Sequence, residues 1–325
     1  MKPKAETGKI AIALHGGAGN LKKLNLTPEE ELAFKAVMDS AITAGYAVLE
    51  RGGTSVDAVE ATIHVMEDSP LFNAGKGAVF NHDGINEMDA AIMNGADLSC
   101  GSITGVRHIR NPISAARLVM DKSEHVFLSG IGAEEFVVAQ GMNLVDSSYF
   151  FTQHRWDQLQ EALEEDKIEL DHDGKKSAAM RDEPREGKFG TVGCVALDKA
   201  GNIAAGTSTG GLTNKRYGRI GDAPLIGAGT YANNASCAVS CTGKGEDFIR
   251  NTIAADIAGR VEYGQESLDS AVHHAIYTKL VASKGRGGCI ALNASGQIAM
   301  AFTTTGMYRA SIDTSGRKEI QIYQK

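Results

Sequence analysis

The segment Gly190-Thr-Val-Gly-Cys-Val-Ala-Leu197 begins with a glycine and a threonine and continues as an apolar run. The run favours a buried β-strand, and a long charged stretch precedes it. Thr191 can be one strand residue among many, because threonine favours strands. A hydroxyl preceded by glycine at the start of a strand is also suited to attack its own upstream peptide bond. That cleavage would give Thr191 a free α-amine with a pKa of about 7.7–8.0, able to act as a general base for the hydroxyl.

The composition indicates a soluble globular chain. Its 325 residues, 42% hydrophobic and 22% charged, suffice for one large domain or two ordinary ones. The net charge of −7 argues against a general nucleic-acid or anionic-membrane binder. There is neither a signal-peptide-like apolar core near the N-terminus nor an uninterrupted run of 18 apolar residues. The five cysteines are scattered without a C-x-x-C pair, so we expect a reducing, cytoplasmic setting.

Capping and turn signals divide the first half of the chain into strands and helices. Thr27-Pro28 followed by Glu30 is a strong helix start, and Gly52-Gly53 is a stop. The expected elements are a strand over 9–14 that ends in the glycine motif 15–19, helices over 27–51 and from 54 to before 70, a hairpin over 80–93, and helices over 111–120 and 133–140.

The second half begins after a charge-rich stretch and contains an internal repeat. We expect a mobile surface linker over about 150–190, charged in more than half of its residues from 161 to 188. Residues 193–209 align without gaps with 288–304, and both segments carry a hairpin signature. Two helices are expected between them, over 245–261 and 267–281. The pattern predicts an α+β fold in which antiparallel pairing dominates.

Three clusters of polar residues and glycines follow Thr191. Thr209 ends the strand expected to pair with the Thr191 strand, so its hydroxyl could hydrogen-bond the nucleophile or its amine. Arg219 and Asp222 could bridge each other on the surface, or hold the α-carboxylate and α-amine of an amino acid. The cluster 241–246 could form a nest for an oxyanion. Each cluster taken alone can be structural, and their joint occurrence after one candidate nucleophile is the functional signal.

Together these motifs resemble the plant-type asparaginases/isoaspartyl peptidases, a branch of the N-terminal-nucleophile hydrolases. The resemblance extends over nearly the whole chain, apart from about 144–189. The residues that carry it are His15–Gly19, Pro70–Gly75, Met88–Gly95, Asn111-Pro112, Gly190–Gly193, Thr207–Gly211, Gly218–Asp222, Gly227–Gly229 and Ser240–Gly243.

The resemblance implies a four-layer αββα sandwich, made as a precursor and cut between Gly190 and Thr191. The fragments 1–190 and 191–325 would together form one structural domain, and two such pairs would form a dimer. Thr191 would be the nucleophile, with Thr209 beside it and with Thr242 and Gly243 as the oxyanion hole.

The resemblance also assigns substrate-binding and metal-binding residues. The substrate would be held by Arg219 and Asp222, assisted by Ile220, Gly221, Lys244, the Gly245 carbonyl and Asn73. No cofactor is required, but a structural sodium ion would be held by backbone carbonyls of Met66, Glu67, Ser69, Phe72, Ala74 and Lys76. Ala223 stands where serine is frequent in the family, which we expect to be a minor change.

The expected activity is hydrolysis of β-aspartyl amide bonds in isoaspartyl dipeptides or L-asparagine, which releases L-aspartate. The expected partners are these small molecules. We expect binding neither to nucleic acid nor to a membrane. A glycosylasparaginase shares the nucleophile chemistry and stays an alternative. So does a non-catalytic amino-acid-binding protein, whose chain would remain intact.

Overall fold

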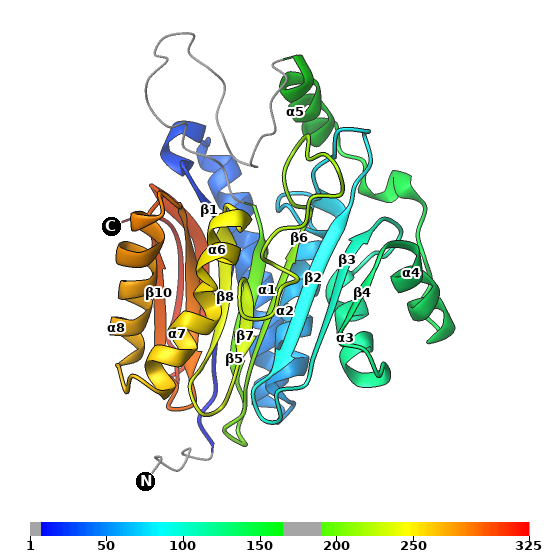
Figure 1. Cartoon of the computed structure of the whole chain (residues 1–325). Coiled ribbons are helices and arrows are strands. Elements are labelled where there is room, and N and C mark those ends of the chain that lie inside the picture. The colour runs from blue at the N-terminus through cyan, green and yellow to red at the C-terminus, as the bar shows by residue number, and fades with distance from the viewer. Residues whose placement is uncertain (1–7, 165–189, 325) are drawn as a thin grey trace.

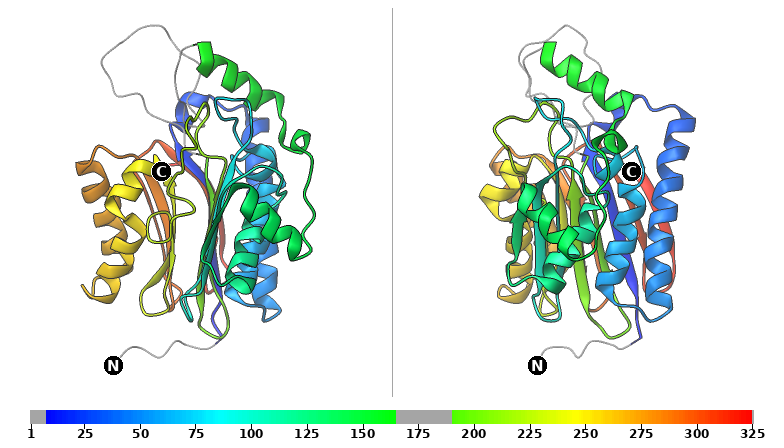
Figure 2. Two further views of the ribbon diagram at one scale, coloured as in Figure 1. Left: turned by 45° about the vertical axis from the view of Figure 1, so that its right-hand side comes forward. Right: turned by 90° about the vertical axis from the view of Figure 1, so that its right-hand side faces the viewer.

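Two β-sheets lie face to face in the computed structural model, which describes residues 8–164 and 190–324. The larger sheet has the strand order β12-β11-β1-β5-β6-β2-β3-β4, and the smaller has the order β10-β9-β8-β7. Helices α1, α2 and α3 cover the outer face of the larger sheet, and α6, α7 and α8 cover that of the smaller (Figures 1 and 2). The structure confirms a mixed fold of helices and sheets.

The strands of the larger sheet are β1 (Ala11–Gly19), β2 (Met88–Asn94), β3 (Cys100–Val106), β4 (Phe127–Ser129), β5 (Val192–Leu197), β6 (Ile203–Thr209), β11 (Gly306–Ile312) and β12 (Lys318–Tyr323). Those of the smaller sheet are β7 (Thr230–Ala232), β8 (Cys237–Gly243), β9 (Gly287–Asn293) and β10 (Ile298–Phe302). The helices are α1 (Pro28–Glu50), α2 (Ser55–Glu67), α3 (Pro112–Lys122), α4 (Gly130–Ala139), α5 (Gln153–Glu164), α6 (Gly245–Asn251), α7 (Ile253–Glu262) and α8 (Leu268–His273), which continues as a π-helical segment over His274–Leu280.

The alternation of side chains along β1 explains the layers. Ile12 and Leu14 pack against the helices on the outer face, whereas Ala11 and Ala13 face the smaller sheet. The space between the sheets is filled by apolar residues of both, many of them alanine, valine or isoleucine, and a separate apolar cluster lies under α7 and α8. A polar side chain buried between the sheets is therefore costly unless it finds a hydrogen-bond partner or a ligand.

The predicted helix starts are confirmed. The Thr27 side chain accepts from the Glu30 N–H and the Glu30 carboxylate accepts from the Thr27 N–H, and Thr54 with Asp57 forms a second capping box. By length and composition alone, α1 is long and apolar enough to cross a membrane. The search of the sequence for an uninterrupted apolar run did not find this helix, because polar residues interrupt it. Here α1 packs on α2, β1 and β11.

Both predicted hairpins of the second half are also confirmed. β5 pairs antiparallel with β6 and β9 pairs antiparallel with β10. Antiparallel pairing dominates as expected, with β3 and β4 as a parallel exception. In the β5–β6 hairpin Val192 lies opposite Ser208, which brings Thr191 and Thr209 to the same end.

Several boundaries differ from the prediction. β1 does not end before the glycine motif but runs through it to Gly19, because the motif pairs with β5 and β11. The hairpin expected over 80–93 is confirmed only at its turn, where Phe80 and Asn86 form one antiparallel bridge; its extension to residue 93 is wrong, because β2 pairs with β3 and β6. The helix expected over 245–261 is interrupted at Thr252, whose φ of 46° is left-handed.

The expected linker over about 150–190 is wrong in its first part. Residues 153–164 form α5, which is anchored by the buried Arg155. Arg155 Nε donates to the Gly77 carbonyl at 2.8 Å. The apolar residues Leu159 and Ala162 are buried on the same helix, a pattern that the high charge of the segment obscured. The rest of the expected linker, 165–189, lies outside the described residues.

Candidate active site

Thr191 lies directly before β5 and is 8% exposed. Its Oγ1 donates a hydrogen bond to Thr209 Oγ1 at 3.1 Å. The Gly211 N–H donates to the same Thr209 oxygen at 3.0 Å. The hydroxyl of Thr191 is therefore held in place by the end of the neighbouring strand.

Asn73 joins the Gly190 carbonyl to the loop that follows β6. Its backbone N–H donates to the Gly190 carbonyl at 3.1 Å, and its side-chain Nδ2 donates to the Gly211 carbonyl at 2.8 Å. Asn73 Oδ1 accepts from the Val79 N–H at 3.0 Å, which fixes the orientation of the amide. A donor on the Gly190 carbonyl withdraws electron density from the carbon that Thr191 would attack.

His15 is a further site residue, which the sequence marks only as the first residue of the glycine motif His15–Gly19. Its Nδ1 lies 3.0 Å from the Thr191 carbonyl oxygen, and its Nε2 lies 2.9 Å from Ser240 Oγ on β8. Burial lowers the pKa of His15 to about 3, although the hydrogen bond to Thr191 opposes this shift. The imidazole is therefore neutral at physiological pH. The only sequence signal was its place at position 15, directly before the paired glycines.

Arg219 and Asp222 do not bridge each other, which corrects one of the two expectations for this pair. Arg219 instead donates two hydrogen bonds to Glu246 on α6, from Nε to Oε1 at 2.9 Å and from Nη2 to Oε2 at 3.0 Å. Asp222 Oδ2 is buried without a hydrogen-bond partner among the described residues. Burial raises the pKa of Asp222 to about 7, opposed by the positive charge of Arg219. An unpaired buried carboxylate oxygen beside a guanidinium suits a ligand that carries a positive charge.

Gly245 lies against both of these residues. A Cβ at Gly245 would come within 2.9 Å of Arg219 Nη2 and 2.8 Å of the Asp222 N, so only glycine lets α6 begin this close. Gly221 adjoins Arg219 in the same loop, whereas the side chains of Ile220 and Lys244 are exposed. The structure thus brings Arg219, Asp222 and Gly245 together.

Thr242 supplies a second unpaired polar atom. Its Oγ1 is buried and has no hydrogen-bond partner among residues 8–164 and 190–324. Thr242 lies two residues after Ser240 on β8, and therefore on the same face of that strand. Gly243 follows, and a Cβ there would collide with Phe248. A hydroxyl left without a partner next to a backbone N–H is a suitable donor pair for an oxyanion.

Lys215 and Asp89 also belong to this region; no motif pointed to Lys215, and Asp89 was only part of the Met88–Gly95 motif. The buried Lys215 Nζ donates to the carbonyls of Glu87 at 2.9 Å and Gly210 at 3.1 Å, and burial lowers its pKa. Asp89 lies opposite Thr209 in the β2–β6 pairing, and its Oδ1 accepts from Gly105 N at 3.0 Å. Sequence distance hides such neighbours, because only the sheet order makes them adjacent.

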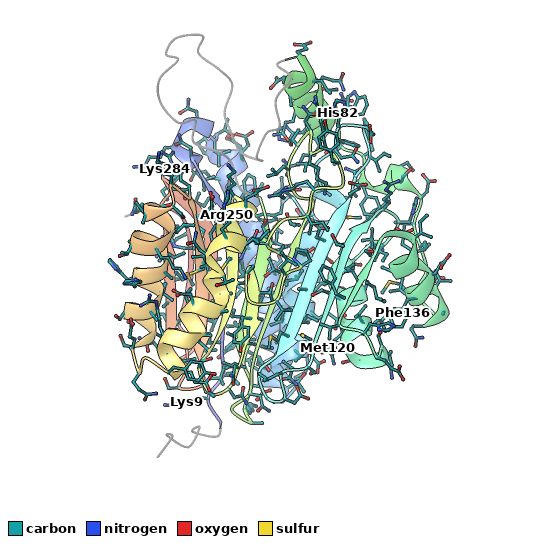
Figure 3. All side chains as sticks on the ribbon, viewed as in Figure 1. Lys9, His82, Met120, Phe136, Arg250 and Lys284 are labelled. Atoms are coloured by element: carbon teal, nitrogen blue, oxygen red, sulfur yellow. The ribbon has the colours of Figure 1, made fainter. Side chains whose placement is uncertain are left out.

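The site lies toward the end of the molecule that carries α5. Figure 3 shows His82 at that end and Lys9, just before β1, at the opposite end. β1 runs from the Lys9 end, and β5 is antiparallel to it, so β5 begins toward the α5 end. Thr191 therefore lies on the side of the molecule where α5 is found.

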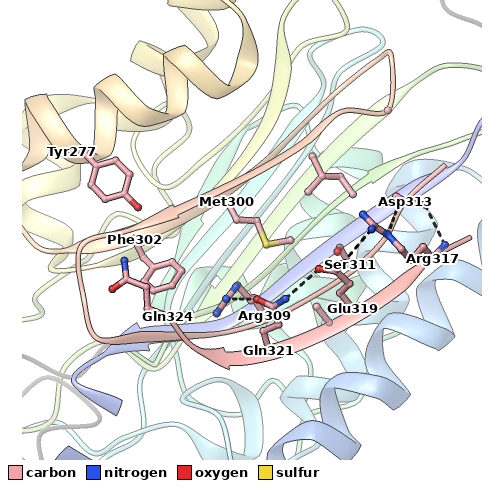
Figure 4. A pocket seen from close by; sticks show the side chains of 13 residues that line it. Tyr277, Met300, Phe302, Arg309, Ser311, Asp313, Arg317, Glu319, Gln321 and Gln324 are labelled. Atoms are coloured by element: carbon pink, nitrogen blue, oxygen red, sulfur yellow. Dashed lines mark hydrogen bonds and ion pairs between the residues drawn. The ribbon is translucent and has the colours of Figure 1, made fainter. Parts of the chain in front are cut away.

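A hollow of about 600 Å³ is separate from this site. Figure 4 shows its lining between β10 and the β11–β12 pair, including Met300, Phe302, Arg309 and Gln321. Arg309 stacks 4.9 Å from the Phe302 ring centroid and donates to the Met307 carbonyl at 2.9 Å. These contacts satisfy Arg309 structurally, and the hollow contains none of the site residues described above.

The loop expected to hold sodium follows α2 and turns tightly. Gly75 has a φ of 53°, and its missing side chain lets the backbone pass beside the Glu67 carbonyl. The Met66, Phe72 and Ala74 carbonyls already accept backbone hydrogen bonds, but each retains a second lone pair. The six carbonyls of Met66, Glu67, Ser69, Phe72, Ala74 and Lys76 are hard oxygen donors in this loop.

The fold and site together define a class of protein: an enzyme built for attack on a carbonyl by a strand-terminal hydroxyl. The sequence profile of a family described as asparaginase matches residues 8–322. The chain belongs to this asparaginase family.

Proteins similar to this chain are named as isoaspartyl peptidases or L-asparaginases. The chain is 48% identical over 303 residues to an isoaspartyl peptidase of Escherichia coli strain K12, covering 93% of this chain and 92% of that protein. It is 41% identical over 329 residues to a probable isoaspartyl peptidase/L-asparaginase 2 of Arabidopsis thaliana, covering 98% and 100%. It is 41% identical over 298 residues to an isoaspartyl peptidase/L-asparaginase of Bos taurus, covering 92% and 91%.

Proposed function

We propose that this protein is an isoaspartyl peptidase/L-asparaginase that cleaves itself between Gly190 and Thr191 and then uses Thr191 as its nucleophile. The observation that carries the proposal is the geometry of the junction. The Thr191 hydroxyl is hydrogen-bonded to Thr209, and the carbonyl before it receives the Asn73 N–H. Family membership and the names of relatives support the same activity.

Maturation begins when Thr191 Oγ attacks the Gly190 carbonyl carbon. The C–N bond between these residues breaks, the amine leaves with a proton, and Gly190 becomes esterified to Thr191. Water then hydrolyses the ester, which gives a carboxylate at Gly190 and restores the hydroxyl. Before this step the Thr191 nitrogen is an amide and cannot accept a proton, so the intact chain is inactive toward substrate.

In turnover the Thr191 amine accepts the proton of the attacking hydroxyl. The oxygen attacks the side-chain carbonyl of an aspartyl amide, and the Thr242 hydroxyl with the Gly243 N–H stabilises the oxyanion. The amine returns its proton to the leaving ammonia or amino acid. Water then hydrolyses the aspartyl ester and releases L-aspartate.

The substrate is oriented by its own charged α-groups. Arg219 pairs with the α-carboxylate, and Asp222 pairs with the α-ammonium group. The buried Oδ2 of Asp222, which has no hydrogen-bond partner among the described residues, supports this role. The Gly245 carbonyl and Asn73 complete the contacts, and Ile220, Gly221 and Lys244 line the surroundings. This orientation places the β-carbonyl, rather than the α-carbonyl, at Thr191.

The finer architecture follows from the same proposal. The mature protein is an αββα sandwich of the N-terminal-nucleophile type, in which fragments 1–190 and 191–325 form one domain and two such pairs form a dimer. A sodium ion held by the six carbonyls of the 66–76 loop would stiffen that loop beside the site. The five free cysteines support a reducing, cytoplasmic setting.

Denaturing electrophoresis and aspartate release test the proposal together. Wild-type protein should yield fragments near residues 1–190 and 191–325 and release aspartate from asparagine and from a β-aspartyl dipeptide. Thr191→Ala should show one intact band and no release. An intact wild-type chain that binds aspartate would instead support an amino-acid-binding protein, and selective release from a glycosylated asparagine would support a glycosylasparaginase.

A further inference from the structure

Four buried side chains form a continuous hydrogen-bonded series behind Thr191. They come from β7, β6, β8 and β1: Thr230 Oγ1 lies 2.6 Å from Thr207 Oγ1, which lies 2.7 Å from Ser240 Oγ, which lies 2.9 Å from His15 Nε2. The series ends at the Thr191 carbonyl, 3.0 Å from His15 Nδ1. It therefore crosses between the two sheets and reaches the candidate nucleophile.

The direction of every hydrogen bond in the series follows from elementary chemistry. A carbonyl oxygen only accepts, so His15 Nδ1 carries the proton that is donated to Thr191. Nε2 of the neutral ring is then an acceptor, and Ser240 must donate to it. Having donated its one proton, Ser240 accepts from Thr207, and Thr207 in turn accepts from Thr230, whose single hydroxyl proton is shared with the Ala223 carbonyl at 3.0 Å. The series is thus oriented toward the Thr191 carbonyl throughout.

Because the four side chains are buried, the direction of these hydrogen bonds is fixed within the protein. His15, Ser240, Thr207 and Thr230 are all 0% exposed, so solvent cannot supply replacement partners. The space for the central contact comes from Gly193, which lies opposite His15 on β5. A Cβ at Gly193 would collide with both Ser240 Oγ and His15 Nε2. Glycine at this position is therefore required for the contact between the two sheets.

We propose that His15 is a positioning residue for the nucleophile. The hydroxyl series holds its ring in the tautomer with the proton on Nδ1, which donates a hydrogen bond to the Thr191 carbonyl. The inference rests on the proposed function, in which the peptide bond before Thr191 is lost. β5 begins only at Val192, so cleavage removes the covalent restraint on the amino side of Thr191. After cleavage, His15 of the 1–190 fragment still holds the Thr191 carbonyl. This hydrogen bond restrains rotation of the Thr191 backbone, and so it fixes the positions of the Thr191 amine and hydroxyl.

This role predicts a characteristic kinetic signature. Substrate α-groups bind at Arg219 and Asp222, so losing the His15 contact should lower kcat and leave KM largely unchanged. A displacement of about 1 Å costs about 100-fold in rate, which sets the expected scale for His15→Phe. His15→Gln should recover part of the loss, because its amide can both donate to Thr191 and accept from Ser240. His15 does not exchange protons with substrate, so the pH profile of kcat should keep its shape.

Ser240→Ala tests the series without altering His15, and Ser102→Ala is its matched control. Ser102 is also a buried strand serine, but its Oγ has no hydrogen-bond partner among the described residues. Turnover is measured per cleaved molecule. Ser240→Ala should lower kcat by about tenfold, the scale of one lost hydrogen bond. Ser102→Ala should not, and His15→Phe/Ser240→Ala should be no slower than His15→Phe alone.

Imidazole ¹⁵N NMR tests the tautomer in the full-length Thr191→Ala protein, which keeps the carbonyl at position 191. His15 should show a protonated Nδ1 and a bare Nε2 between about pH 5 and 8, a range in which an ordinary histidine titrates. A protonated Nε2, or equal kcat values for Ser240→Ala and Ser102→Ala, would overturn the inference. Failure of the wild-type chain to cleave or release aspartate would instead overturn the proposed function.

Discussion

Arg219 and Glu246 form an ion pair with two parallel hydrogen bonds, of 2.9 and 3.0 Å, between the 218–222 loop and the first turn of α6. The pair occupies Nε and one hydrogen of Nη2. A guanidinium has five donors, so Arg219 retains donors for a substrate carboxylate while Glu246 fixes its orientation. The negative charge of Glu246 also opposes the binding of a second carboxylate.

Replacing Arg219 should separate substrate binding from self-cleavage. Arg219→Ala should raise KM by about 10- to 150-fold, since hydrogen bonds to charged groups contribute about 1.5–3 kcal/mol. Cleavage should proceed, because the junction contacts involve Asn73 and Thr209 instead. Steady-state kinetics and electrophoresis check both expectations. Glu246→Gln is the matched variant, and it should lower KM by removing the competing charge; complete loss of cleavage in Arg219→Ala would contradict the assigned role.

Thr242→Val should impair catalysis without destabilising the fold. Removing one oxyanion donor costs about 2.7–4 kcal/mol, or about 10²–10³ in kcat. The Thr242 hydroxyl has no partner within the described residues, so its loss breaks no internal hydrogen bond. Thermal unfolding should therefore occur at the wild-type temperature or slightly above it. A large fall in stability with unchanged kcat would show that the hydroxyl is structural.

Asp222 should make substrate binding depend on pH. Burial raises its pKa to about 7, and only the ionised form attracts an α-ammonium group, so KM should fall as pH rises through about 7. The effect on stability has the opposite sense. Between the unperturbed pKa of 3.8 and about 7 the folded state binds more protons than the unfolded state, so stability falls as pH rises across that window. Compared with the wild type, Asp222→Asn should lose the fall of KM near pH 7, and its urea midpoint should fall less steeply as pH rises between 3.8 and about 7.

His15 should contribute to acid unfolding. Its folded pKa of about 3 lies below the ordinary value of 6.5, so between these values the unfolded state binds the extra proton. Stability from this group is complete above about pH 6.5 and is lost as pH falls toward 3. Urea midpoints of Thr191→Ala, with and without His15→Gln, check this without interference from cleavage. Parallel acid profiles of the two proteins would contradict a neutral buried His15.

Local signals in the sequence were sufficient for much of the secondary structure. The capping boxes at Thr27 and Thr54 and the two repeated hairpins depend on residues a few positions apart, and the structure confirms them. The hairpin expected over 80–93 does not extend beyond the Phe80–Asn86 bridge, because alternation cannot identify the partner of a strand, and β2 pairs with β3 and β6. The charge of the 150–164 region likewise masked the few buried residues that hold α5 in place.

The sequence by itself indicated the candidate nucleophile, because the glycine-threonine pair at the start of an apolar run occurs together with polar and glycine motifs after it. It also marked the loop that carries Arg219 and Asp222 and the segment that carries Thr242. Only the tertiary structure joined His15 to Thr191 and Ser240, Glu246 to Arg219, and Lys215 to Glu87. These contacts link segments separated by up to 225 positions. The contacts of His15 depend on sheet order and on the distance between the two sheets, and that of Arg219 depends on how a loop meets the first turn of α6; no local spacing encodes either.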